Sequence, residues 1–130
     1  MTPRVAVLDD TPALLLLYEV ILGPRGYYVY TFDQETATPE AVAAVQPDLV
    51  IISAAYPIEK YDVPLLVALR SQPELACKPI IIASAVSQNI LTPDAYVPFE
   101  PISLLMKPFG HDELLACVRE ALSAKASSGR

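Results

Sequence analysis

The chain has 130 residues, which fits one domain, and a domain of this length buries about two-thirds of its unfolded surface. Hydrophobic residues make up 53% of the sequence, yet no apolar run approaches the roughly 20 residues of a membrane-spanning helix, and no signal peptide is evident. The net charge of −6 argues against a nucleic-acid-binding surface. These features predict a cytoplasmic domain that neither enters a membrane nor binds nucleic acid.

The cysteines and prolines indicate the state of the thiols and the stiffness of the connections. Cys77 and Cys117 stand alone, without the spacing of a metal site, so we expect two reduced thiols. Thirteen prolines against four glycines predict stiff connections and short helices, because proline fixes φ and removes a hydrogen-bond donor.

The predicted elements alternate between strand and helix along the chain. In the first half, apolar β-branched runs and Thr-Pro helix starts predict a strand at 4–8, a helix at 12–22, a strand at 27–32, a short helix at 39–45 and a strand at 49–53. In the second half we expect a helix at 63–70, a strand at 79–84, a strand at 103–106 and a helix from 110 to about 124. The proline-rich stretch 86–101 gives no clear prediction.

This alternation predicts a parallel sheet with helices on both faces, connected by right-handed crossovers. Three of the predicted strands end in polar residues, namely Asp9-Asp10, Ser53 and Ser84. In such sheets, binding sites form at the carboxyl ends of the strands. We therefore expect these side chains to converge at one edge of the sheet.

The order of these residues resembles the receiver domain of two-component response regulators. That family carries an acidic pair after strand one, an aspartate that accepts a phosphoryl group after strand three, Ser or Thr after strand four, and Lys-Pro after strand five. The matching positions here are Asp9-Asp10, Ser53, Ser84 and Lys107-Pro108. The resemblance implies a flavodoxin-like (CheY-like) α/β three-layer sandwich with a five-stranded parallel sheet in the order 2-1-3-4-5. It implies a receiver-like domain over 4–125, followed at 126–130 by a flexible tail or a truncated linker.

The family chemistry requires a carboxylate where this chain has Ser53. In receivers the acids help to hold Mg²⁺, the lysine pairs with the acceptor, and the hydroxyl after strand four binds the phosphate. A serine hydroxyl is un-ionised near neutral pH and needs a general base, and the one histidine, His111, opens the last helix instead. We therefore expect Asp9 and Asp10 to hold Mg²⁺ weakly if at all, no other cofactor, and Lys107 to pair with one of these acids.

A second departure lies at the switch position. Receivers place Tyr or Phe three residues before the lysine, whereas this chain has Leu104. The prolines at 93, 98 and 101 are expected to remodel the fourth helix of the family. Both the input and the output surface should therefore differ from those of a typical receiver.

Each site residue also has a purely structural interpretation. Asp9-Asp10 could serve only to end a strand and cap a helix, and Ser84 could be only a strand-end hydroxyl. Lys107 could serve only to hold the acids, while Pro108 shapes its loop. His111 reads as a surface residue at a helix start.

The leading functional hypothesis is a pseudo-receiver that is not phosphorylated on aspartate and acts by protein–protein contact. Its partner would be a histidine kinase, an output domain or a second copy of the chain. The alternative is a regulatory module on the same fold that responds to an anion, a metal or phosphorylation of Ser53. An enzyme with Ser53 as nucleophile is disfavoured, because the sequence has no Gly-x-Ser-x-Gly elbow and no suitably placed histidine.

Overall fold

The structure is a computed structural model that describes residues 2–9, 11–33, 36–54, 66–84, 101–106 and 109–128, apart from the side chains of 53, 54, 84, 104, 106 and 124–128. Its centre is a five-stranded sheet in the order β2-β1-β3-β4-β5, and every neighbouring pair is parallel. The strands are β1 (Arg4–Leu8), β2 (Tyr28–Phe32), β3 (Leu49–Ala54), β4 (Ile80–Ser84) and β5 (Ile102–Met106). The predicted parallel sheet and its strand order are confirmed.

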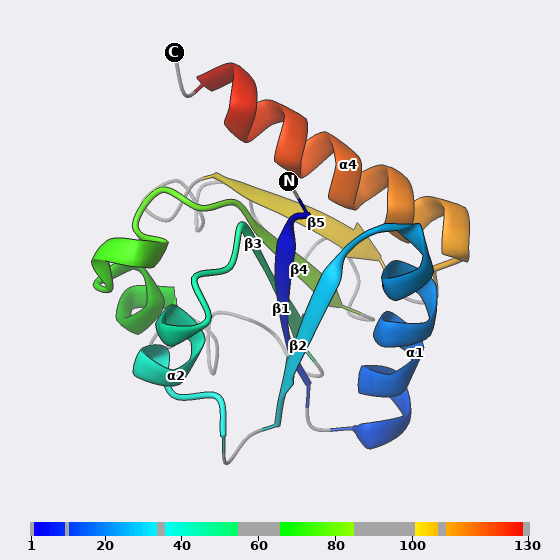
Figure 1. Ribbon diagram of the computed structural model, residues 1–130, viewed down its shortest axis with the longest axis horizontal. Coiled ribbons are helices and arrows are strands. Elements are labelled where there is room, and N and C mark those ends of the chain that lie inside the picture. The colour runs from blue at the N-terminus through cyan, green and yellow to red at the C-terminus, as the bar shows by residue number, and fades with distance from the viewer. Residues whose placement is uncertain are drawn as a thin grey trace.

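Helices cover both faces of this sheet (Figure 1). One face carries α1 (Pro12–Leu22) and α4 (His111–Ser128). The other carries α2 (Pro39–Ala44), a helical stretch at 66–70 and a 3₁₀ turn, η2 (Pro73–Leu75). The three layers are those expected from the sequence.

Element boundaries agree with the prediction to within one residue at most ends. The largest difference is at α4, which ends at Ser128 and so includes residues 126–128 that the sequence assigns to a tail. Alanine and lysine at 124–126 favour helix, so the apolar spacing that suggested an end near 124 does not mark the end of the helix. The stretch 86–100 lies outside the described residues, as do residues 63–65 of the predicted third helix.

Two hydrophobic clusters, one on each side of the sheet, form the core. Successive residues of β1 alternate between them: Ala6 and Leu8 join the cluster under α2, whereas Val5 and Val7 join the cluster under α1 and α4. All four side chains are buried. This burial on both faces explains why the central strands read as continuous apolar runs in the sequence.

The two Thr-Pro helix starts are capped differently. The Thr38 hydroxyl accepts a hydrogen bond from the backbone N–H of Ala41 at 3.1 Å, as an N-cap residue should. The Thr11 side chain makes no such bond, although its carbonyl accepts from Leu14 and Leu15. Thr38 therefore caps α2 through its side chain, whereas Thr11 occupies the N-cap position of α1 without a side-chain bond to the helix.

A left-handed residue ends α2. Gln46 has φ of 52°, a conformation that costs an L-residue about 1–2 kcal/mol and that glycine adopts freely. Its N–H donates to the Ala43 carbonyl at 3.0 Å, which satisfies one group at the helix end. The chain then enters Pro47 and β3, so this turn sets the direction of the central strand.

The caps of the two helices predict unequal effects of the same substitution. Thr38→Ala should lower the free energy of unfolding by about 1 kcal/mol, because it removes the acceptor for the Ala41 N–H. Thr11→Ala is the matched control and should have the smaller effect. Urea denaturation of both variants measures the difference, and equal losses would contradict the assignment of the cap to Thr38.

Glycine should stabilise the end of α2. Gln46→Gly is expected to raise the free energy of unfolding by about 0.5–1 kcal/mol. The relief of the left-handed backbone conformation outweighs the extra conformational entropy that glycine gives the unfolded chain. Ala44→Gly, two residues earlier on the exposed side of the helix, should instead destabilise the protein. Thermal or urea unfolding tests the opposite signs; a loss of stability in both variants would refute the strain at Gln46.

Candidate functional site

The sheet register brings the predicted site positions to one end. Leu8 pairs with Ile52, so Asp9 and Ser53 are the next residues on neighbouring strands. Ser53 pairs with Ala83, and Ser84 pairs with Met106, the residue before Lys107. The predicted convergence of these positions at the carboxyl ends of β1, β3, β4 and β5 is present in the backbone.

Asp9 contacts the backbone at the start of α1 through its side chain. Its backbone N–H donates to the Phe32 carbonyl at 3.0 Å, and its carboxylate oxygen Oδ1 accepts from the Thr11 N–H at 2.8 Å. The residue is only 8% exposed. Asp9 therefore joins the end of β1 to the start of α1, which is the helix-start role of the structural interpretation, while it also occupies the position of a receiver acid.

The rest of the predicted pocket is described less fully. Asp10, Lys107 and Pro108 lie outside the described residues. Ser53, Ser84 and Leu104 are placed by their backbone in β3, β4 and β5, and Leu104 pairs with Ile82. The side-chain contacts within the pocket, including the pairing of Lys107 with an acid, stay predictions.

The segment after Lys107-Pro108 rests on α1. Phe109 is half-buried, and its ring lies 5.8 Å from the fully buried ring of Tyr18, at a tilt of 41°. Two residues later, His111 begins α4 as an exposed residue, as the sequence suggested. The Gly110 N–H donates to the Glu113 carboxylate at 2.8 Å and so fixes the start of this helix.

The donor set suits a divalent cation poorly. Mg²⁺ prefers several hard oxygen ligands, and the sequence offers the carboxylates of Asp9 and Asp10 with a neutral hydroxyl at Ser53. Within the described part of the chain, no group of three or more His, Cys, Asp or Glu side chains could hold a metal ion.

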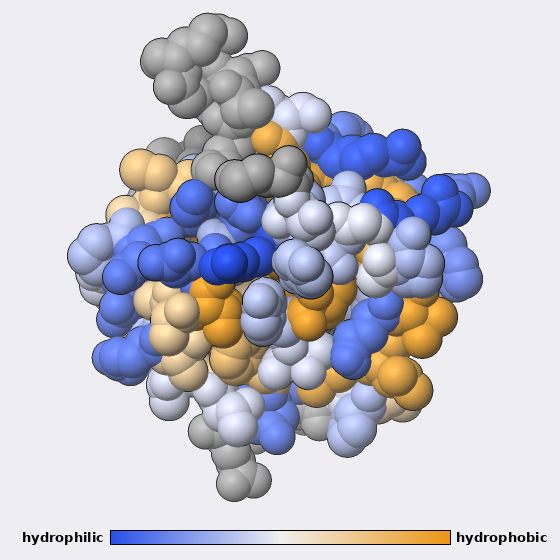
Figure 2. Space-filling view, in the orientation of Figure 1, coloured by the Kyte–Doolittle hydropathy of each residue, from blue (hydrophilic) through white to orange (hydrophobic). Residues whose placement is uncertain are grey.

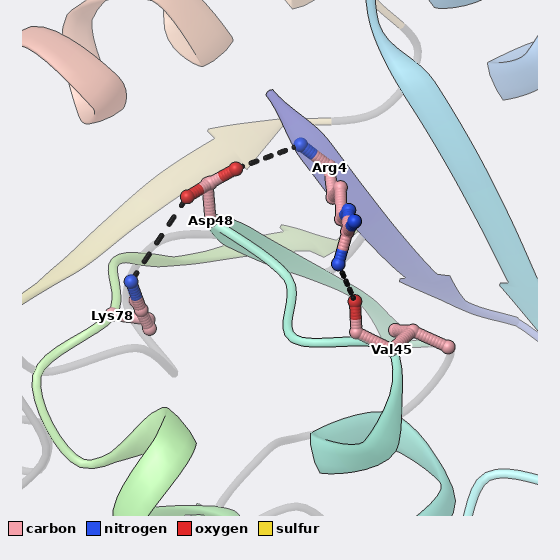
Figure 3. Close-up of polar contacts among 4 residues, drawn as sticks. All are labelled: Arg4, Val45, Asp48 and Lys78. Atoms are coloured by element: carbon pink, nitrogen blue, oxygen red, sulfur yellow. Dashed lines mark hydrogen bonds and ion pairs between the residues drawn. The ribbon is translucent and has the colours of Figure 1, made fainter. Parts of the chain in front are cut away.

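The opposite end of the sheet carries a polar cluster that the sequence did not reveal (Figure 3). Asp48 accepts a hydrogen bond from the Arg4 backbone N–H at 2.9 Å and lies 4.0 Å from the Lys78 amine. The Arg4 guanidinium donates to the Val45 carbonyl at 3.1 Å. Pro47-Asp48 directly precedes β3 in the sequence, but no local pattern there indicates the partners of Asp48.

A hollow of about 680 Å³ lies beside this cluster, at the amino ends of the strands. Its lining includes Arg4, Asp48 and Lys78 together with Thr2, Tyr28, Gln46 and Glu74. Its cations and acids balance in number. Because it lies at the end of the sheet opposite Asp9 and Ser53, this hollow is not the receiver pocket.

Arg70 ties the helical stretch 66–70 to the start of β5. Its guanidinium donates to the carbonyls of Leu75 at 2.7 Å, Lys78 at 2.6 Å and Pro101 at 3.0 Å. Burial lowers the pKa of Arg70 from its ordinary value, and the nearby Cys77 acts in the opposite direction. The group remains a cation, so its role is to satisfy carbonyl groups at a chain crossing.

The two thiols differ in environment. In the part of the chain that the structure describes, Cys77 and Cys117 are free thiols and are not joined in a disulfide. Cys77 is exposed, whereas Cys117 lies half-buried in α4. Burial raises the pKa of the Cys117 thiol, and the charge of Glu120 raises it further. Cys117 is therefore a packed thiol rather than a reactive one.

The chain is similar in sequence to a transcriptional regulatory protein. No family model matches the chain. It is 32% identical over 121 residues to the transcriptional regulatory protein KdpE of Mycobacterium tuberculosis, in two strains, and the match covers 91% of this chain. The chain spans half the length of this relative, since the match covers 50% of it.

Solved structures show the same fold at low identity. A sensor protein from Polaromonas sp. JS666 matches with a TM-score of 0.81 and 21% identity, over 96% of this chain and 99% of that chain. A response regulator from Desulfuromonas acetoxidans has a TM-score of 0.76 and 20% identity, with 93% and 97% covered. The chemotaxis response regulator CheY4 of Vibrio cholerae has a TM-score of 0.75 and 22% identity, with 93% and 99% covered.

The fold and these similarities define the class of this chain. It is a receiver-like domain of the two-component response-regulator type, with the CheY-like, flavodoxin-like fold that the sequence predicted. No helix among the described residues is long and apolar enough to cross a membrane.

The thiol environments predict unequal alkylation. At pH about 8, iodoacetamide should modify Cys77 about tenfold or more faster than Cys117, because the thiolate is the reacting form and Cys117 is both shielded and raised in pKa. Raising the pH through the ordinary pKa of 9.0 should speed the modification of Cys117. Peptide mass spectrometry measures both rates, and the urea-unfolded chain, where the rates should be similar, is the control. Equal rates in the folded chain would contradict the burial of Cys117.

Proposed function

We propose that this chain is a pseudo-receiver: a receiver-like domain that is not phosphorylated on aspartate and works through protein–protein contact. The observation that supports this most directly is Ser53, which occupies the end of the central strand β3 where the family has its phosphoacceptor. Asp9 follows the last residue of β1 on one side of Ser53, and on the other side Ser53 pairs with Ala83, the residue before Ser84 at the end of β4. The acceptor position is therefore altered within a retained framework.

The chemistry of serine explains why one substitution suffices. Formation of an acyl phosphate requires a carboxylate oxygen to attack phosphorus, and a neutral hydroxyl attacks only when a base removes its proton. The one histidine begins α4 as an exposed residue. Asp9 already accepts the Thr11 N–H through Oδ1, which anchors the start of α1. Ser53 is thus a small structural residue in this proposal.

The proposal extends to the organisation of the protein. The receiver-like domain occupies residues 4–125, is not an enzyme, and acts in the cytoplasm on a histidine kinase, an output domain or a second copy of itself. The similarity to one half of the regulator KdpE fits a domain that works with a further protein module. Leu104 at the switch position fits a surface that does not respond to phosphate.

Restoring one carboxylate tests the proposal. The wild-type chain and a Ser53→Asp variant are incubated with acetyl phosphate and Mg²⁺, and intact mass is measured. We expect wild type to gain no phosphoryl group and Ser53→Asp to gain one, because the aspartate supplies both the nucleophile and a third anionic ligand. Ser123→Asp, which adds a carboxylate on the exposed side of α4, is the matched control and should stay unmodified.

Two results would count against the proposal. A phosphoryl group on a carboxylate of the wild-type chain would show a working aspartyl switch. A stable phosphoryl group on Ser53 itself would favour the alternative of a module that responds to serine phosphorylation. Peptide sequencing of the modified chain locates the phosphoryl group. Treatment with mild base identifies the bond, since acyl phosphates hydrolyse under these conditions and serine phosphate is retained.

A further inference from the structure

Among the residues that the structure describes, β2 forms an open edge of the sheet. It is the terminal strand in the order β2-β1-β3-β4-β5, and none of its five residues is buried, in contrast to β1. Its five consecutive pairs with β1 run without a bulge. An edge strand exposes unpaired backbone groups, and natural proteins usually protect such edges with charges, proline or bulges. The strand Tyr28–Phe32 has none of these devices.

Two hydrogen bonds identify which backbone groups face outward. The Tyr28 N–H donates to the Pro3 carbonyl, and the Phe32 carbonyl accepts from the Asp9 N–H. In a parallel ladder alternate residues face the same neighbour, so Tyr28, Tyr30 and Phe32 face β1. Val29 and Thr31 therefore direct their N–H and C=O groups toward the open edge.

The charges around β2 favour antiparallel pairing with a second copy. Residues 26–32 carry no charge, although the chain as a whole has a net charge of −6 that opposes self-association. Arg25 precedes this neutral stretch and Asp33 follows it, and both are exposed. An antiparallel pair places the Arg25 end of one strand beside the Asp33 end of the other, whereas a parallel pair would place like charges together.

The exposed apolar residues of α1 lie beside the same edge. Leu16 and Val20 are 60% and 57% exposed, one helical turn apart, and α1 packs against β2. Figure 1 shows α1 next to β2 at the outer side of the sheet, and Figure 2 shows apolar surface over this helix at the lower right. This surface gives a symmetric partner something apolar to cover.

We propose that the chain forms a symmetric dimer in which the two β2 strands pair antiparallel about a two-fold axis at Tyr30. Val29 of each copy then lies opposite Thr31 of the other, and their outward groups form four backbone hydrogen bonds across the junction. The two-fold axis runs perpendicular to the joined ten-stranded sheet. It keeps both α1 helices on one face, where Leu16 and Val20 of the two copies approach each other.

In this dimer the partner of the proposed pseudo-receiver is a second copy of the chain. The inference rests to that extent on the proposed function, but its test is independent. Sedimentation velocity over a micromolar-to-millimolar concentration series, without any phosphodonor, measures the dimer dissociation constant. A monomeric wild type that takes no phosphoryl group overturns only the dimer. A dimeric wild type that does become phosphorylated overturns only the pseudo-receiver.

Two pairs of variants locate the contact. Thr31→Pro removes an outward N–H and should raise the dissociation constant about tenfold or more, whereas Thr31→Val keeps that N–H and should leave it nearly unchanged. Val20→Lys should also raise it about tenfold, because two lysines meet across the axis. The matched control Val67→Lys changes an equally apolar residue, 50% exposed, on the helical stretch that packs on the other face of the sheet.

Circular dichroism first establishes that each variant is folded. If Thr31→Pro does not fold, Val20→Lys against Val67→Lys decides the question alone. A wild type that stays monomeric at every concentration overturns the dimer. A wild-type dimer that Val20→Lys leaves intact, or that Val67→Lys weakens as much, places the contact elsewhere and overturns it equally.

Discussion

The placement of β3 between β1 and β4 is the constraint on which the rest of the molecule depends. Leu49, Val50, Ile51 and Ile52 are buried, and they alternate between the two core clusters. A slip of one residue in this strand would send each side chain to the opposite cluster. The same register sets Ser53 between the end of β1 and the end of β4, so core packing and the geometry of the candidate site are fixed together.

Polar contacts at the amino end of the sheet hold this register. The Arg4 N–H donates to the Asp48 carboxylate at 2.9 Å, and the Asp48 N–H donates to the Arg4 carbonyl at 2.7 Å. These reciprocal bonds fix the start of β3 against the start of β1. The left-handed turn at Gln46 delivers the chain to this point, which explains why a strained residue is tolerated there. The contacts that position the candidate site therefore include residues at the opposite end of the same strands.

The sequence predicted the fold well and the candidate site only as positions. Apolar runs such as Ile80–Ser84, separated by proline-rich connections, indicated the strands, since burial on both faces leaves a signal along the chain. Asp9 was predicted correctly at the end of β1, but its bond to the Thr11 N–H depends on how the chain turns into α1. The bond of Asp48 to Arg4 joins residues far apart in sequence, and no local pattern encodes it. The open edge at β2 likewise follows from strand order rather than from the residues of the strand alone.

Asp9 connects the altered site to the surface that the chain presents. Its carboxylate fixes the first turn of α1, and the same helix buries Tyr18 against Phe109 while it exposes Leu16 and Val20. In a phosphorylated receiver the acids must also accommodate a cation and an incoming phosphoryl group, which competes with such a structural role. In the proposed pseudo-receiver, with Ser53 at the acceptor position, that demand would be absent and Asp9 would serve α1 alone. Loss of the acceptor is therefore consistent with a domain whose contact surface is held in one conformation, because the residue that would have taken part in switching stabilises the helix that carries that surface.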